Sequence, residues 1–214
     1  MGKDHGGLAA FYAYFQTYGT ARLDGLGYGY FVGLTDSERE EAWNFLLDGF
    51  PSSGESITGL YSLDWARAVS LFKAAVALPL EAAQYPAQQE AIEENRLLML
   101  RYINDVEADR KYLAAICEFS TSQFKDVRAV FARSVPVQQV THEAVNALKS
   151  MIFAETDTIV LASAIPKLMA IHGMEFDRKN SIYKSIYLSL RSDDPAEKAA
   201  GIDRLEQHQL PDYI

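Results

Sequence analysis

Three segments in the second half of the chain resemble one another: Val127-Arg128-Ala129-Val130-Phe131-Ala132-Arg133, Ala162-Ser163-Ala164-Ile165-Pro166-Lys167-Leu168 and Ala199-Ala200-Gly201-Ile202-Asp203-Arg204-Leu205. Each follows a polar break, and alignment on Ala129, Ala164 and Gly201 separates them by 35 and 37 residues. Helical spacing of apolar residues predicts a partner helix before each segment, over 112–119, 142–153 and 181–190. Helix pairs with such a period indicate an α-solenoid, so we predict an all-α fold of stacked helical hairpins or an irregular helical array.

The first half of the chain carries weaker but similar signals. Helical spacing predicts helices over residues 8–18 and 88–106. Thr35 and Glu38 have the spacing of a capping box, which predicts a helix that begins there. The Gly/Tyr-rich stretch 25–33 lacks the spacing of a dinucleotide-binding or phosphate-binding loop, so we interpret it as a turned connection.

The apolar stripes predict the residues that form the core. We expect the following side chains to be buried: Trp43, Leu47, Trp65, Phe72, Ile103, Ile116, Val130, Leu148, Ile165, Ile186 and Ile202.

The helical pattern also suggests how the chain is divided. We expect residues 1–34 to hold an N-terminal helix and the Gly/Tyr-rich connection, and residues 35–208 to form a helical-repeat domain. Residues 82–89, around Pro86, are predicted to be a linker inside that domain. Residues 209–214 are predicted to be a frayed tail, and the whole chain to be one structural domain.

Composition restricts the classes of partner. The net charge is −9, which disfavours nucleic acid and an anionic membrane surface as partners. No stretch approaches the roughly 20 apolar residues that a membrane span requires. The single cysteine, Cys117, lies in an apolar run and excludes an intramolecular disulfide. We therefore expect a cytoplasmic protein that does not bind a membrane.

The sequence offers no clear catalytic or metal site. His142-Glu143 begins like the zinc motif H-E-x-x-H, but Asn146 stands where the second histidine is required. No residue set resembles a nucleophile with its base, so we expect no catalytic residues, no metal and no cofactor. Paired carboxylates such as Glu93-Glu94 and Asp193-Asp194 leave an enzyme as an alternative.

The repeated segments resemble HEAT-like helical repeats. The resemblance lies in the steps Ala129-Val130, Ala164-Ile165 and Gly201-Ile202 and in the turn Asp193-Asp194-Pro195. It covers roughly half of the chain and implies a scaffold for protein binding, with no catalytic residues to transfer. Pro166 departs from the pattern, because it falls in the second helix of its pair. The alternative that the resemblance leaves open is a HEAT-like enzyme such as a DNA glycosylase or a bilin lyase.

The distribution of charge suggests a protein partner. Residues 1–107 hold 7 basic and 15 acidic residues, whereas residues 108–214 hold 13 and 14. We therefore predict a non-enzymatic module that binds and neutralises a basic protein, in the manner of an immunity protein or antitoxin. The residues predicted to bind the partner are Glu38, Glu41, Glu90, Glu93, Glu94, Tyr28 and Tyr30.

Overall fold

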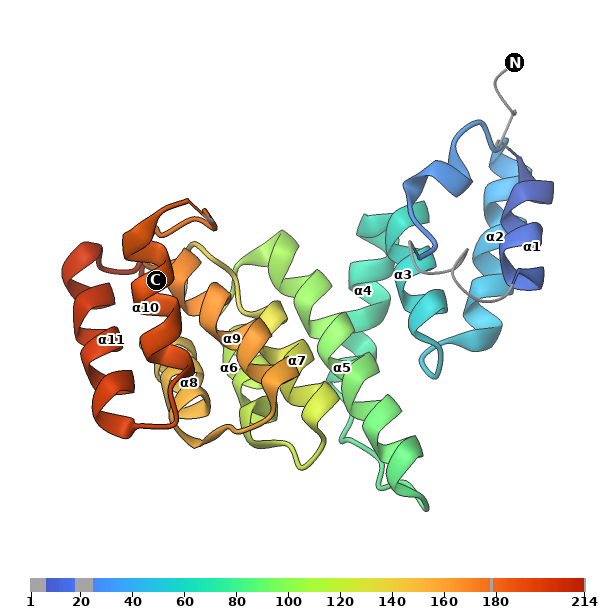
Figure 1. The fold of residues 1–214 in the computed structure, drawn as a ribbon. Helices are drawn as coiled ribbons and strands as arrows, with labels where there is room; N and C mark the ends of the chain where they lie inside the picture. The colour runs from blue at the N-terminus through green and yellow to red at the C-terminus, as the bar shows by residue number, and fades with distance from the viewer. Residues whose placement is uncertain (1–6, 18–24, 178, 214) are drawn as a thin grey trace. The chain divides into compact units, whose positions relative to one another are not determined.

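The described part of the chain is predominantly helical. The computed structural model describes residues 7–17, 25–177 and 179–213. These residues form eleven α-helices and two short 3₁₀ helices, and their only β-type pairing is an isolated bridge between Val140 and Tyr213. The prediction of an all-α fold is therefore confirmed (Figure 1).

The chain divides into two compact units, Met1–Ala83 and Gln84–Ile214. The division falls within the linker predicted at residues 82–89, and helices that we assigned to one domain from residue 35 onward lie in both units.

The N-terminal unit contains four α-helices and one 3₁₀ helix among its described residues. They are α1 (Leu8–Gln16), η2 (Tyr28–Phe31), α2 (Asp36–Gly49), α3 (Gly54–Leu63) and α4 (Trp65–Val76). The predicted capping box is present, because the Thr35 side chain accepts from the Glu38 amide while Glu38 accepts from the Thr35 amide. α3 packs against α2, α4 and η2. At Gly59 a Cβ would lie 2.6 Å from Leu26 and 2.8 Å from Leu46, so this close approach requires glycine.

Among its described residues, the C-terminal unit contains seven α-helices and one 3₁₀ helix. They are α5 (Pro86–Glu107), α6 (Arg110–Cys117), η3 (Glu118–Thr121), α7 (Lys125–Ser134), α8 (His142–Ala154), α9 (Thr158–Ile171), α10 (Ser181–Arg191) and α11 (Pro195–His208). All six helices predicted from the echoing segments and their partners are present. Side chains of Asp109, Thr141, Asp157, Asn180 and Asp194 cap the N-termini of five of them.

The helices of the C-terminal unit pack in two layers. In one layer α7 packs against α5 and α9, and α9 packs against α10. In the other layer α8 packs against α6 and α11. The layers alternate along the chain until α9, but α10 then stays beside α9 and α11 beside α8 (Figure 1). The three echoing segments therefore do not occupy equivalent places, because α7 and α9 lie in one layer and α11 lies in the other.

Lysine side chains donate hydrogen bonds to carbonyl groups at the C-terminal ends of two helices in this unit. Lys198 is buried, and its Nζ lies 2.7 Å from the Ile152 carbonyl oxygen at the end of α8. Lys167 from α9 donates in the same way to the carbonyls of Arg133 and Val135 at the end of α7. A cation suits these positions, because the last carbonyls of a helix lack partners within the helix and carry partial negative charge.

The core prediction is largely confirmed, and it is wrong at Trp65. Trp65 has 56% of its side chain exposed. It is the first residue of α4, and because a helical Cα–Cβ bond tilts toward the N-terminus, the side chain projects beyond the helix end. Leu47 and Val130 are only half-buried, at the edges of their stripes. The buried members are Trp43, Phe72, Ile103, Ile116, Leu148, Ile165, Ile186 and Ile202.

The described part of the C-terminal tail is held in place, contrary to the expectation that it frays. The Gln209 carbonyl lies 2.6 Å from Nδ1 of the buried His172, and Asp212 accepts from the Val140 amide at 2.9 Å. The Tyr213 ring stacks on His142 with 3.7 Å between centroids. These partners lie on α8, just after α9 and in the connection before α8, so the tail contacts several elements of its unit.

Candidate protein-binding surface

An aromatic cluster joins α1 to α2 in the N-terminal unit. Phe45 from α2 makes edge contacts with Phe11, Tyr12 and Phe15 from α1, with ring centroids 5.5, 5.3 and 4.9 Å apart. Phe11 is fully buried, whereas Phe45 has 38% of its side chain exposed. The cluster therefore extends from the core to the surface, where its outer rings are fixed by the inner ones.

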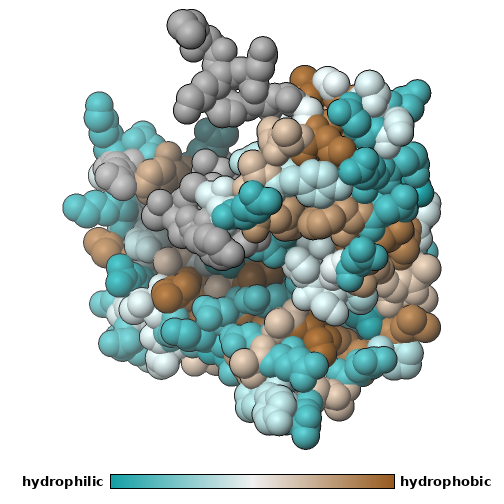
Figure 2. Space-filling model, turned by 90° about the vertical axis from the view of Figure 1, so that its right-hand side faces the viewer, coloured by the Kyte–Doolittle hydropathy of each residue, from teal (hydrophilic) through white to brown (hydrophobic). Residues whose placement is uncertain are grey.

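Three large aromatic side chains are exposed among the described residues of this unit. Tyr28 of η2 is 69% exposed, and Trp65 and Phe45 join it on the surface. In Figure 2 the side of the molecule that carries α1 and α2 faces the viewer, and apolar side chains there lie among hydrophilic ones. Exposed aromatic residues bordered by polar groups are typical of protein interfaces.

The helix α2, which carries Phe45, also carries two of the carboxylates that were predicted to bind the partner. Glu41 is exposed and accepts a 2.8 Å hydrogen bond from the Tyr12 hydroxyl, which raises the pKa of Tyr12. Glu38 instead accepts from the Thr35 amide and hydroxyl, which lowers the pKa of Glu38. Glu41 can therefore face a partner with its second oxygen, whereas Glu38 serves mainly to begin the helix.

A third carboxylate of α2 connects this helix to α4. Glu40 lies 2.7 Å from Arg67, and the Arg67 guanidinium lies over the Trp43 ring at 4.1 Å from its centroid. Tyr30, which was also predicted to bind the partner, is half-buried and packs edge-on against the buried Tyr14 at 5.3 Å. Of the predicted residues in this unit, Tyr28 and Glu41 are thus the most accessible.

The predicted residues Glu90, Glu93 and Glu94 lie on α5 in the other unit and are half-buried. Glu93 accepts a 2.6 Å hydrogen bond from the Ser122 hydroxyl, in the connection before α7. Burial raises the pKa of Glu94, the charges of Glu90 and Asp126 add to that rise, and Arg133 opposes it. Glu93 therefore links α5 to the connection before α7, and the seven predicted residues are divided between the two units.

The structure also shows a polar pocket that the sequence analysis missed. The last turn of α5, with Asn104, Asp105 and Ala108, and residues 136–139 line a pocket of about 330 Å³. Asn104 is only 6% exposed, and its side-chain oxygen has no hydrogen-bond partner. The sequence contained one signal for this pocket. Asn104 is a polar residue within the apolar stripe of α5, next to Ile103 and four residues after Leu100.

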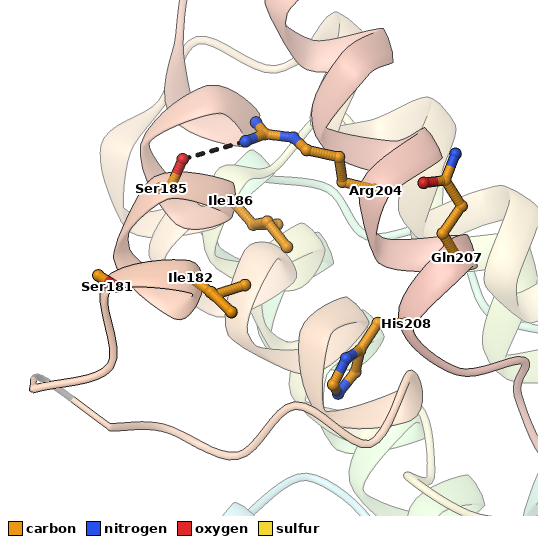
Figure 3. Close-up of a pocket in the computed structure, with 7 residues that line it drawn as sticks. All are labelled: Ser181, Ile182, Ser185, Ile186, Arg204, Gln207 and His208. Carbon is orange, nitrogen blue, oxygen red and sulfur yellow. Dashed lines mark hydrogen bonds between the residues drawn. The ribbon is translucent and has the colours of Figure 1, made fainter.

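A second groove, of about 510 Å³, lies between α10 and α11 (Figure 3). Ile182 and Ile186 line it from α10, and Arg204 and His208 line it from α11. The Arg204 guanidinium donates to the hydroxyls of Ser185 and Ser189 and to the Ala200 carbonyl. Because the guanidinium is already bonded within its own hairpin, this groove offers little chemistry to a ligand.

Two other kinds of site do not occur among the described residues. No helix in the described part of the chain is long and apolar enough to cross a bilayer. Over residues 7–17, 25–177 and 179–213, no three His, Cys, Asp or Glu side chains are grouped so that they could hold a metal ion.

Comparisons with known proteins leave the chain without an assigned family. No protein-family model, no curated protein and no solved structure matches it. The resemblance to HEAT-like repeats therefore stays a prediction from the sequence.

Proposed function

We propose that this protein is a binding module for a basic protein and that the partner contacts the surface of the N-terminal unit. The observation that carries the proposal is the exposure of Tyr28, Phe45 and Trp65 in a unit whose charged residues are mostly acidic. Residues 1–83 hold five basic and ten acidic residues. Glu41 and Asp48 are exposed on α2, the helix that carries Phe45.

The two features of this surface support different parts of binding. Aromatic anchors that become buried in an interface supply most of its affinity, and their loss mainly accelerates dissociation. Carboxylates at the rim attract a basic partner over a longer range and mainly accelerate association. A small acidic protein of this kind would suit the role of an immunity protein or antitoxin that covers a basic effector.

The experiment begins with capture of the partner from a lysate of the source organism, its identification and binding kinetics at two salt concentrations. The charge variant is Glu41→Lys with Asp48→Lys, and the anchor variants are Tyr28→Ala and Trp65→Ala. A matched control, Glu175→Lys with Asp203→Lys, makes the same change in net charge at exposed positions of the C-terminal unit.

We expect a basic partner, slower association for the charge variant at low salt, and faster dissociation for the anchor variants. The control should bind with nearly unchanged rates. An acidic partner, or an equal loss of association rate in the control, would show that the N-terminal surface is not the binding site.

A further inference from the structure

The C-terminal tail, residues 209–213, is attached to its unit by two hydrogen bonds and one ring stack. The three contacts join Gln209 to His172, Asp212 to Val140, and Tyr213 to His142. Of the two histidines among these partners, His172 is buried, with 1% of its side chain exposed, whereas His142 is exposed. One end of the tail is therefore held by a buried titratable group.

The bond to Gln209 determines which ring nitrogen of His172 carries the proton. A carbonyl oxygen can only accept, so Nδ1, which lies 2.6 Å from it, must be the N–H of the neutral ring. Nε2 then holds a lone pair, and among the described residues no partner reaches this buried atom. A second proton at Nε2 would place a charge in a buried site with no acceptor for its N–H group. The attached tail therefore favours the neutral ring.

The charged groups around His172 do not offset this cost. Burial lowers the pKa of His172, and the bond to the Gln209 carbonyl opposes that shift. Lys149 on α8 and His208 on α11 lower the pKa further, whereas Glu206 on α11 raises it. Glu206 is itself paired with Lys149, so its charge is shared with a cation. The pKa of His172 therefore lies below the ordinary value of a histidine while the tail is attached.

The tail lies directly against the end of α9, beside this ring. Gly173, the residue after His172, has φ 73°, in the left-handed region that favours glycine. The side-chain oxygen of Gln209 lies 2.0 Å from the place where a Cβ of residue 173 would stand. Because Gln209 contacts both residues, lifting the tail opens the His172 ring to water on the side of Nδ1, where a charged ring can be hydrated.

We propose that residues 209–213 form an acid-released tail, whose attachment requires His172 to be neutral. In the attached state the ring is buried and neutral, and in the lifted state it is hydrated and can take up a proton. A histidine with a lowered pKa in one state stabilises that state fully above its ordinary pKa and progressively less below it. For one proton, the ratio of attached to lifted tail falls by up to about tenfold per pH unit below about pH 6.5. The inference concerns the C-terminal unit and does not rest on the proposed function.

The test follows hydrogen exchange of the Val140 amide by NMR in the ¹⁵N-labelled full-length protein, because the tail supplies the acceptor of this amide. Between pH 7.5 and pH 5 we expect the protection factor of Val140 to fall by about tenfold. The amide of Leu148, within α8, should keep its protection. The nitrogen shifts of the His172 ring should show the proton on Nδ1 at pH 7.5 and a titration midpoint below about 6.5.

Three variants assign the effect to one histidine. His172→Asn keeps a donor for the Gln209 carbonyl but cannot take up a proton, so its Val140 protection should be the same at pH 7.5 and pH 5. His142→Phe keeps a ring that can stack on Tyr213, and His208→Gln replaces an exposed histidine of α11. Both of these control variants should retain the pH dependence of the wild type.

Several results would overturn the proposal. They are constant Val140 protection in the wild type, an equal loss in His172→Asn, an equal loss at Leu148, and a ring proton on Nε2 at pH 7.5. If His172→Asn does not fold, the wild-type ring decides. A His172 midpoint at or above about 6.5 would then overturn the proposal, and a lower midpoint together with the loss of protection at Val140 would support it.

Discussion

The ion pair between Arg128 and Glu155 offers a direct measure of what stabilises the C-terminal unit. Arg128 Nε lies 2.7 Å from Glu155 Oε2, and the two side chains are only 20% and 8% exposed. Arg128 also donates to the Ser122 carbonyl at 2.9 Å, and Glu155 accepts from the amide of Asp157 at 2.9 Å. The pair therefore links the start of α7 to the connection between α8 and α9.

We predict that Glu155→Gln destabilises the protein by about 2–3 kcal/mol, the usual effect of losing a hydrogen bond between charged groups and leaving one of them half-buried. At about 2–4 °C per kcal/mol for a chain of this size, the melting temperature should fall by about 4–12 °C. The control is Glu40→Gln, which removes an ion pair whose members are 43% and 61% exposed and should cost less than about 0.5 kcal/mol.

The effect of Glu155→Gln on stability should also depend on pH. Burial raises the pKa of Glu155, but hydrogen bonds from Arg128, Asp157 and Thr156 outweigh it and lower the pKa below its ordinary value. A group with a lowered folded pKa contributes stability above its unfolded pKa and loses it as the pH falls through the folded pKa. The difference in melting temperature between wild type and Glu155→Gln should be complete at pH 7 and should shrink below about pH 4.3.

Thermal unfolding followed by circular dichroism measures both effects. A Glu155→Gln effect no larger than that of Glu40→Gln, or a difference that grows toward acid pH, would refute the reasoning.

Two further predictions concern buried groups of the C-terminal unit. Lys198→Met should cost about 1–3 kcal/mol, because it removes the donor to the Ile152 carbonyl; Lys184→Met, at an exposed position of α10, should leave the urea midpoint nearly unchanged. Burial raises the pKa of Cys117 to about 12, so almost no thiolate is present at pH 8 and the folded protein should not react with a thiol-specific disulfide reagent until urea unfolds it. Rapid labelling without denaturant would contradict the second prediction.

The local signals in the sequence were sufficient for the helices but not for their arrangement. Thr35 with Glu38, and the caps before α9 and α11, are recognisable because a capping side chain contacts amides two or three residues away. The place of α11 depends on how the α10–α11 hairpin packs against α9 and α8, which no short-range pattern encodes. The exposure of Trp65 was missed for a related reason. An apolar stripe in the sequence shows which face of a helix is buried, but it does not show that a residue at the first position of the helix lacks packing neighbours.

The candidate surface was predictable only in part. Charge counts identified the acidic half of the chain, and the exposure of Tyr28 and Glu41 is consistent with that prediction. The counts could not show that Glu38 begins its own helix or that Glu93 bonds to Ser122. The Asn104 pocket was out of reach as well, because its walls come from residues about 30 positions apart in the sequence.

The lysines that complete the ends of α7 and α8 have a consequence for how the C-terminal unit folds. Each belongs to a later helix of the same layered array: Lys167 on α9 completes α7, and Lys198 on α11 completes α8. The carbonyls at these helix ends acquire their partners only after the later helix has docked. The hairpins therefore do not reach their full stability one at a time, and the unit folds with greater cooperativity than a stack of independent repeats.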